Sequence, residues 1–170
     1  MRLLRSLGSL RAVITALVAI TAVQIGLIAF GNITDYGTNA EFVQHVFAMD
    51  TTFQTDGTMW RAITTPGLAQ AGYLAVIVWE VLTAVVLVAA FVFWVRPGSQ
   101  GIDTARRLAS LGWLLELLLF GGGFITIGGE WFQMWQSDKW NGLQPALQNL
   151  VIAGIGLVLV HLPMRESAER

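Results

Sequence analysis

The sequence contains no cysteine, and this absence excludes several kinds of chemistry at once. Without a thiol, the chain has no disulfide, no thiolate metal site, no iron–sulfur cluster and no cysteine nucleophile. The absence does not identify the compartment in which the protein works.

Charge is also scarce. Only 12% of the 170 residues are charged and the formal net charge is -1, whereas soluble domains have about 25% charged residues. No excess of positive charge indicates a nucleic-acid partner, and none is predicted.

Motifs of enzymes and cofactor-binding proteins are missing as well. The sequence has no phosphate-binding Gly-Lys loop, no dinucleotide fingerprint and no arrangement typical of a Ser-His-Asp triad. Its two histidines, His45 and His161, fall at opposite ends of the spans predicted below, so they cannot both ligate one haem. We therefore predict that the protein is not an enzyme and has no cofactor, no metal site and no catalytic residue.

Long apolar runs are what the chain does have, and 55% of its residues are hydrophobic. Runs of about 20 apolar residues are typical of membrane-spanning helices. We predict an all-α, four-span transmembrane bundle that forms a single membrane domain over residues 1–170. The predicted spans are about 12–30, 68–95, 106–128 and 143–163. A signal peptide is the alternative for the first run, which is long for that role, so a retained span is favoured.

Local signals help to set the helix boundaries. Thr65-Pro66 is a good helix start, because proline loses no needed hydrogen bond in a first turn. Arg96-Pro97-Gly98 ends the second span, and Asp103 is the predicted N-cap of the third. Gly121-Gly122-Gly123 permits close packing or a kink within the third span.

Basic residues indicate the orientation, because they favour the cytoplasmic flanks of spans. In a four-span arrangement, eight of the ten lie on one side and only Arg61 and Lys139 on the other. The eight are Arg2, Arg5, Arg11, Arg96, Arg106, Arg107, Arg165 and Arg170. We predict a multi-pass protein of the bacterial inner membrane with both termini in the cytoplasm.

The outward segment of residues 31–65 is too long for a simple connection. Within it, TNAEFVQHVFAMD predicts a short amphipathic helix on the outer face, with Thr38 and Glu41 at capping-box spacing. Such a helix lies in the interface or covers the bundle. His45, Glu41 and Asp50 could supply metal ligands, but this combination is common and a solvated helix face is favoured.

The second outward segment, residues 129–142, is rich in tryptophan. Trp131, Trp135 and Trp140 are typical of an aromatic belt at the membrane–water boundary. The alternative is an aromatic-walled outer pocket with Glu130 at its mouth. The belt is favoured.

Two glutamates interrupt the spans themselves. Glu80 lies about 22 Å from the boundary marked by Arg96, and Glu116 about 14 Å from that marked by Arg107. A charged residue at such a depth costs roughly 2.5–3.5 kcal/mol on insertion scales, so a proton, a bound cation or a basic group of a partner chain must neutralise each one.

Two interpretations of the glutamates remain open. Glu130, Glu80 and Glu116 would form a stepped series across the membrane that passes protons or holds a cation. Alternatively, Glu80 and Glu116 are neutral and join helices by hydrogen bonds to Gln24, Thr83 or a backbone carbonyl.

Four stretches resemble a bacterial family of predicted small integral membrane proteins, which is catalogued as a domain of unknown function. They are NITDYG from Asn32, FVQHVFAMDTTF from Phe42, WEVLTA from Trp79 and GGEWFQMWQS from Gly128. The resemblance implies a four-helix inner-membrane protein. It implies no activity, cofactor or site residue.

Two functions are consistent with these features. The favoured one is an accessory or structural subunit of a larger membrane complex, which accounts for the small size, the elaborate outward segments and the lack of a catalytic motif. The alternative is a proton- or cation-conducting transport protein that uses Glu80 and Glu116, as an oligomer. The predicted partners are the lipid bilayer and other membrane subunits or further copies of the chain.

Overall fold

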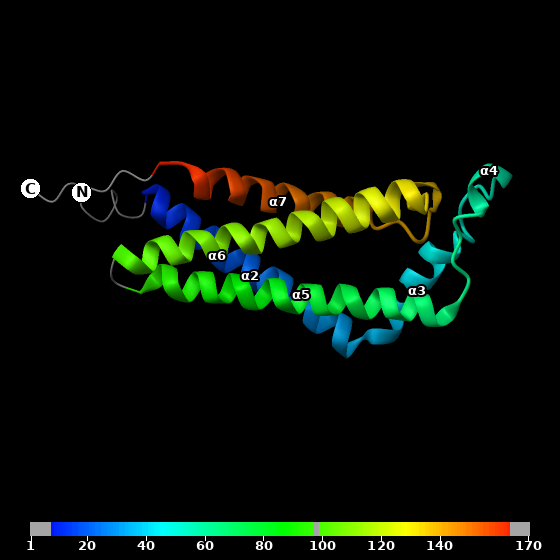
Figure 1. Ribbon diagram of the computed structural model, residues 1–170, viewed down its shortest axis with the longest axis horizontal. Coiled ribbons are helices and arrows are strands. Elements are labelled where there is room, and N and C mark those ends of the chain that lie inside the picture. The colour runs from blue at the N-terminus through cyan, green and yellow to red at the C-terminus, as the bar shows by residue number, and fades with distance from the viewer. Residues whose placement is uncertain (1–7, 97–98, 164–170) are drawn as a thin grey trace, which may run out of the picture.

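The computed structural model describes residues 8–96 and 99–163, and every regular element within them is helical. Four long helical segments lie side by side in an elongated bundle (Figure 1). All four are long and apolar enough to cross a membrane, which confirms the predicted fold class. They are α2 (Leu10–Thr34), α5 (Pro66–Val95), α6 (Ser99–Leu117) continued by η1 (Leu118–Trp131), and α7 (Leu143–His161).

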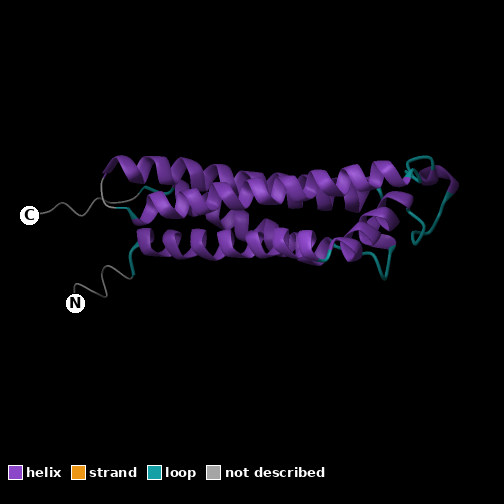
Figure 2. Ribbon diagram, turned by 90° about the horizontal axis from the view of Figure 1, so that it is seen from below, coloured by secondary structure: helices purple, strands orange, loops and turns teal. Residues whose placement is uncertain are grey.

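The two ends of the bundle differ in character (Figures 1 and 2). At the basic end, α2 begins, α5 ends, α6 begins and α7 ends; Arg11, Arg96, Arg106 and Arg107 lie there. At the opposite end, called the α3 end, lie α3 (Tyr36–Ala48), α4 (Asp56–Met59) and η2 (Met134–Gln136). Arg2, Arg5, Arg165, Arg170, Pro97 and Gly98, which entered the sequence predictions, lie outside the described residues.

Helix boundaries follow the sequence signals in part. Helix α5 begins at Pro66 after Thr65, as predicted. The predicted N-cap role of Asp103 is wrong, because α6 begins at Ser99 and Asp103 lies inside it. The helical segment then runs on to Trp131, beyond the predicted end at residue 128. Helix α2 likewise continues past Phe30 to Thr34.

Helix α3 confirms the predicted amphipathic helix but not its capping box. It begins at Tyr36, so Thr38 lies inside it and donates a hydrogen bond from its hydroxyl to Asp35 Oδ1 (3.0 Å). The capping box is absent because α3 starts almost directly from the end of α2. Its apolar face buries Val46 and Met49 against Phe132 and Met134. Helix α3 therefore covers the bundle.

The half of the bundle near the basic end is filled by an apolar layer. Helix α5 packs most extensively against α2 and α6, and α6 also packs against α7. The layer consists of side chains that are at most 2% exposed: Ile14, Val18, Leu87, Ala90, Trp94, Ala105, Ala109 and Val160. No charged side chain belongs to this set. The layer separates the basic end from the middle of the bundle.

The glycine-rich stretch of the third span widens into a π-helix, η1. The Thr126 hydroxyl donates to the Gly121 carbonyl (2.9 Å) and Phe132 N donates to the Ile127 carbonyl (3.0 Å), both across five residues. Such helices are rare and occur frequently at functional sites. Sequence analysis allowed close packing or a kink at Gly121–Gly123. The structure has a π-helix there, and close packing at Gly121, where an added Cβ atom would lie 3.1 Å from Leu150 Cδ1.

Candidate functional site

A cavity of about 530 Å³ occupies the half of the bundle near the α3 end. Helices α2, α3, α5, η1 and α7 all contribute to its wall. Its polar lining comprises Asn32, Asp35, Asn39, Tyr73, Glu80, Asn141 and Asn149. Asp35 and Asn141 are exposed and mark its rim. The cavity therefore opens toward the α3 end.

Glu80 is a buried wall residue of this cavity, with only 1% of its surface exposed. Asn32 Nδ2 donates a hydrogen bond to Glu80 Oε2 (2.7 Å). The other end of the same amide, Asn32 Oδ1, accepts a hydrogen bond from Asn39 Nδ2 (2.7 Å). One asparagine thus connects α2 to both α5 and α3 and fixes the orientation of the carboxylate.

Tyr73 holds the same asparagine through its backbone. The Tyr73 hydroxyl donates to the Asn32 carbonyl oxygen (3.0 Å), and the Tyr73 ring packs against Tyr36 with centroids 4.9 Å apart. Tyr73 is 2% exposed. These contacts hold the end of α2 against α5, beside the polar residues that line the cavity.

A second amide pair lies on the α7 side of the cavity. Gln24 Nε2 donates to Asn149 Oδ1 (2.9 Å), and Asn149 Nδ2 donates to the Pro145 carbonyl (2.8 Å). Both amides therefore have their hydrogen-bonding groups oriented by neighbours. Gln24 was a predicted partner of a glutamate, and its hydrogen bond goes to Asn149.

Glu116 is equally buried but has a different environment. It is 1% exposed, and neither carboxylate oxygen has a hydrogen-bond partner within residues 8–96 and 99–163. One turn toward the basic end, Trp113 Nε1 donates to Thr21 Oγ1 (3.3 Å). Helices α2 and α6 run in the same direction. Gln24 therefore lies one turn from Thr21, and Glu116 one turn from Trp113, both toward the α3 end.

The two glutamates lie at about the same level of the membrane. Trp79 Nε1 donates to the Leu115 carbonyl (2.9 Å), so the residues just before Glu80 and Glu116 are in contact across α5 and α6. The predicted stepped series, with Glu116 deeper, is wrong because α6 begins earlier than the sequence indicated. Glu130 is exposed at the end of η1 and does not belong to the cavity lining.

Sequence analysis missed the amides that surround Glu80. The predicted partner Thr83 instead donates to the Trp79 carbonyl (2.8 Å). Asn32 was placed outside the first span, which was predicted to end at Phe30. A signal was present, because Asn32 continues the helical spacing of the buried residues Ile25 and Ala29.

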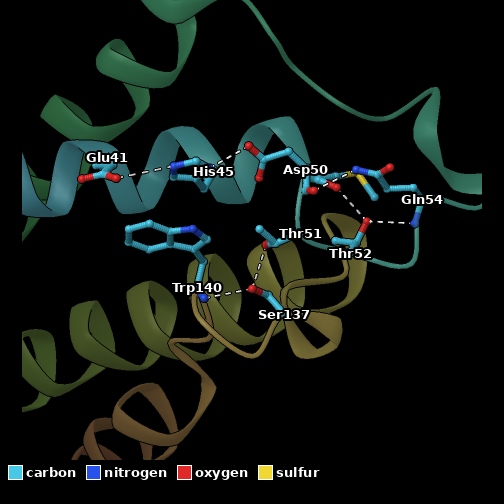
Figure 3. A network of polar contacts seen from close by, with 9 residues as sticks. Glu41, His45, Asp50, Thr51, Thr52, Gln54, Ser137 and Trp140 are labelled. Atoms are coloured by element: carbon cyan, nitrogen blue, oxygen red, sulfur yellow. Dashed lines mark hydrogen bonds and ion pairs between the residues drawn. The ribbon is translucent and has the colours of Figure 1, made fainter.

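The outer candidates His45, Glu41 and Asp50 form a separate cluster on α3 (Figure 3). His45 Nδ1 lies 2.7 Å from Asp50 Oδ2, and His45 Nε2 lies 3.7 Å from Glu41 Oε1. The two carboxylates thus approach opposite nitrogens and do not converge on one point. No group of three potential metal ligands occurs in the described part of the chain.

Glu41 and Asp50 are exposed, in keeping with the favoured solvated helix face, whereas the His45 ring is only partly exposed. That ring is stacked on Trp140 with centroids 4.6 Å apart and an interplanar angle of 10° (Figure 3). Nearby, the hydroxyls of Thr51 and Ser137 are 2.7 Å apart, and Trp140 N donates to Ser137 Oγ (2.9 Å). The cluster attaches the end of α3 to the segment before α7.

Trp131 and Trp135 lie on the surface of the α3 end and not in the cavity wall. Trp131 makes an edge contact with Trp60 at 5.5 Å between centroids, and the Arg61 guanidinium lies over the Trp131 ring at 5.1 Å. Trp135 makes a similar edge contact with Phe53. These exposed rings have the amphipathic character of a membrane-boundary belt.

Four apolar helices around a partly polar cavity define an integral membrane protein with several spans. The chain belongs to the family described as predicted small integral membrane protein (DUF2165), which matches residues 10–163. The family has no established function. Comparisons with curated proteins and with solved structures found no match.

Proposed function

We propose that this protein binds a cation at Glu80 from the outer side of the bacterial inner membrane, as the loading step of a transport role. The observation that supports this most directly is the hydrogen bond of 2.7 Å from Asn32 to a Glu80 carboxylate that is 1% exposed and lines an open-rimmed cavity. The oriented amide favours an ionised carboxylate, because it donates to it. The proposed role is binding and transport, not catalysis.

Burial distinguishes among the three ways of neutralising the glutamates. Glu116 is 1% exposed and does not line the cavity, so a basic side chain of a neighbouring subunit would have to displace packed helices to reach it. For Glu80, the cavity gives a cation access. For Glu116, whose oxygens have no partner among the described residues, a proton is the simplest neutralising group.

The orientation in the membrane is part of the proposal. The basic end carries four of the six basic residues in the described ranges, which supports its placement in the cytoplasm. The α3 end and the cavity rim then face outward. The apolar layer separates the cavity from the cytoplasmic side, so release inward requires that layer to open, as in alternating access.

Cation binding tests the proposal directly. Sodium, potassium and ethylammonium would be titrated by calorimetry into the purified protein in lipid nanodiscs. We expect at least one to bind, and Glu80→Gln to weaken that binding at least tenfold while the fold stays intact, because the amide keeps the size of the side chain. Glu130→Gln, which removes an exposed carboxylate, is the matched control.

Two results would contradict the cation proposal. One is equal binding to the original protein and to Glu80→Gln, and the other is no binding of any of the three ions. For any ion that binds, transport is then measured as uptake of that ion into proteoliposomes. We expect Glu80→Gln to abolish it.

A second candidate is the accessory subunit favoured by sequence analysis. The observation that supports it is the aromatic surface of the α3 end, where Trp60 is 68% and Phe53 is 67% exposed. Native mass spectrometry of the protein extracted in mild detergent from its own membrane tests this candidate. A defined larger complex would support it, and a single chain or homo-oligomer would contradict it.

A further inference from the structure

A second cavity adjoins the first and has a different lining. Its volume is about 200 Å³, and every residue around it is apolar or glycine. Phe42, Val43, Val76 and Phe124 line both cavities, so the polar and apolar spaces share one wall. The two cavities therefore lie side by side, with these four residues between them and with Glu80 lining the first cavity.

Glycines create room in the second cavity. A Cβ atom at Gly123 would meet only Leu119 Cδ1, at 3.9 Å, so the space beside the η1 backbone is open there. Gly72 and Gly128 line the same cavity on α5 and η1. The unusual π-helix thus presents backbone without side chains to this space.

Aromatic rings in the first cavity favour an organic cation over a strongly hydrated metal ion. Phe42, Tyr73, Phe120 and Phe124 line it together with the Glu80 carboxylate. Aromatic faces attract ammonium groups, and aromatic walls are the usual means of binding alkylammonium ligands. The amide oxygens and the carboxylate accept the N–H bonds of such a group.

We propose that the cation of this site is the ammonium group of a small amphipathic amine, whose apolar part occupies the second cavity. This inference rests on the cation-binding role proposed above. The size of the apolar part follows from volume, since an apolar cavity of about 150 Å³ accommodates a benzene ring. The ligand class is therefore an alkylamine with an apolar group of about one ring.

Three probes separate the two parts of the site in the protein as it stands, in nanodiscs. Phenethylamine carries both the ammonium and a ring, ethylamine only the ammonium, and phenethyl alcohol only the ring. We expect phenethylamine to bind roughly tenfold to a hundredfold more tightly than ethylamine, because its ring leaves water. We expect phenethyl alcohol to bind more weakly than phenethylamine by at least tenfold.

A matched pair of glycine variants tests where the ring lies. Gly123→Leu fills the apolar cavity, so phenethylamine should lose its advantage over ethylamine. Gly122→Leu is the control, because a Cβ atom there meets nothing within 4 Å and Gly122 lines neither cavity. The advantage should persist in this control.

The outcomes separate this inference from the broader cation proposal. Equal affinities for phenethylamine and ethylamine in the original protein overturn the amphipathic-amine inference, and this comparison needs no variant to fold. Tighter binding of phenethylamine than of ethylamine in the Gly123→Leu variant also overturns it. If Glu80→Gln leaves the binding of both amines unchanged, the cation proposal itself fails.

Discussion

The side-chain amide of Asn32 donates to the Glu80 carboxylate at 2.7 Å, while its oxygen accepts a hydrogen bond from Asn39. An Asn32→Leu substitution removes both bonds and leaves the Glu80 carboxylate without this donor. Hydrogen bonds between membrane helices contribute about 0.6 kcal/mol on average and up to about 1.7 kcal/mol. We expect a loss of about 1–2 kcal/mol in unfolding free energy, measured by detergent titration in bicelles.

Thr34→Val on the same helix is the control for Asn32→Leu. Its hydroxyl donates only to the Phe30 carbonyl on an exposed surface, so little change is expected. Equal stability of the Asn32 and Thr34 variants would show that the asparagine does not hold the three helices together.

A protonated Glu116 predicts a distinct infrared signal. Its oxygens have no partner in the described ranges, so the neutral acid should give a carboxylic C=O band shifted by its apolar surroundings. We expect Glu116→Gln to remove that band in infrared spectra of the reconstituted protein. Glu130→Gln, at an exposed site, should leave the band in place. A spectrum of Glu116→Gln identical to the original in this region would refute the prediction.

Packing between α6 and α7 depends on Gly156. A Cβ atom at this position would lie 2.3 Å from Trp113 Cε2, in the middle of a fully buried indole. We expect Gly156→Ala to destabilise the protein by about 1–3 kcal/mol, the usual range for overpacking. Gly154→Ala, on the same helix, meets nothing within 4 Å and should be nearly neutral. Thermal unfolding of the two variants compares them directly, and similar midpoints would contradict the contact.

The absence of cysteine makes the orientation easy to measure. We expect a cysteine at Gln54, an exposed position of the α3 end, to react with a membrane-impermeant maleimide added to intact spheroplasts. A cysteine at Asp103, exposed at the basic end, should react only after lysis. The original chain provides a background without reaction. The reverse pattern would place the cavity on the cytoplasmic side.

The sequence was sufficient for the four helices because long apolar runs dominate a transmembrane fold, and Thr65-Pro66 gave the start of α5 correctly. Glu80 and Glu116 stood out for the same reason, as charges in apolar surroundings. Their relative depth did not follow, because it depends on where α6 begins. The start at Ser99 brings Glu116 to the level of Glu80.

The hydrogen bonds of the cavity amides were harder to predict than the four helices. Asn32 and Asn39 are ordinary polar residues near a helix end. Packing of α2 against α5 brings Asn32 to Glu80, and the fold of α3 against the bundle brings Asn39 to Asn32. His45 illustrates the same limit, since its stacking on Trp140 joins segments that are distant in the sequence. Contacts of this kind depend on tertiary packing, and the spacing of Asn32 indicated only that its side chain would be buried.

The apolar layer has an electrical consequence. In the orientation proposed above, the cavity opens to the outer side, so most of the membrane voltage would fall across the apolar layer between Glu80 and the basic end, about 22 Å of α5. A ligand that reaches Glu80 from outside crosses little of that field, whereas one charge crossing the layer exchanges about 2.3 kcal/mol per 100 mV. The proposed orientation thus predicts that binding at Glu80 depends little on the membrane potential, whereas passage of the charge across the apolar layer depends on it strongly.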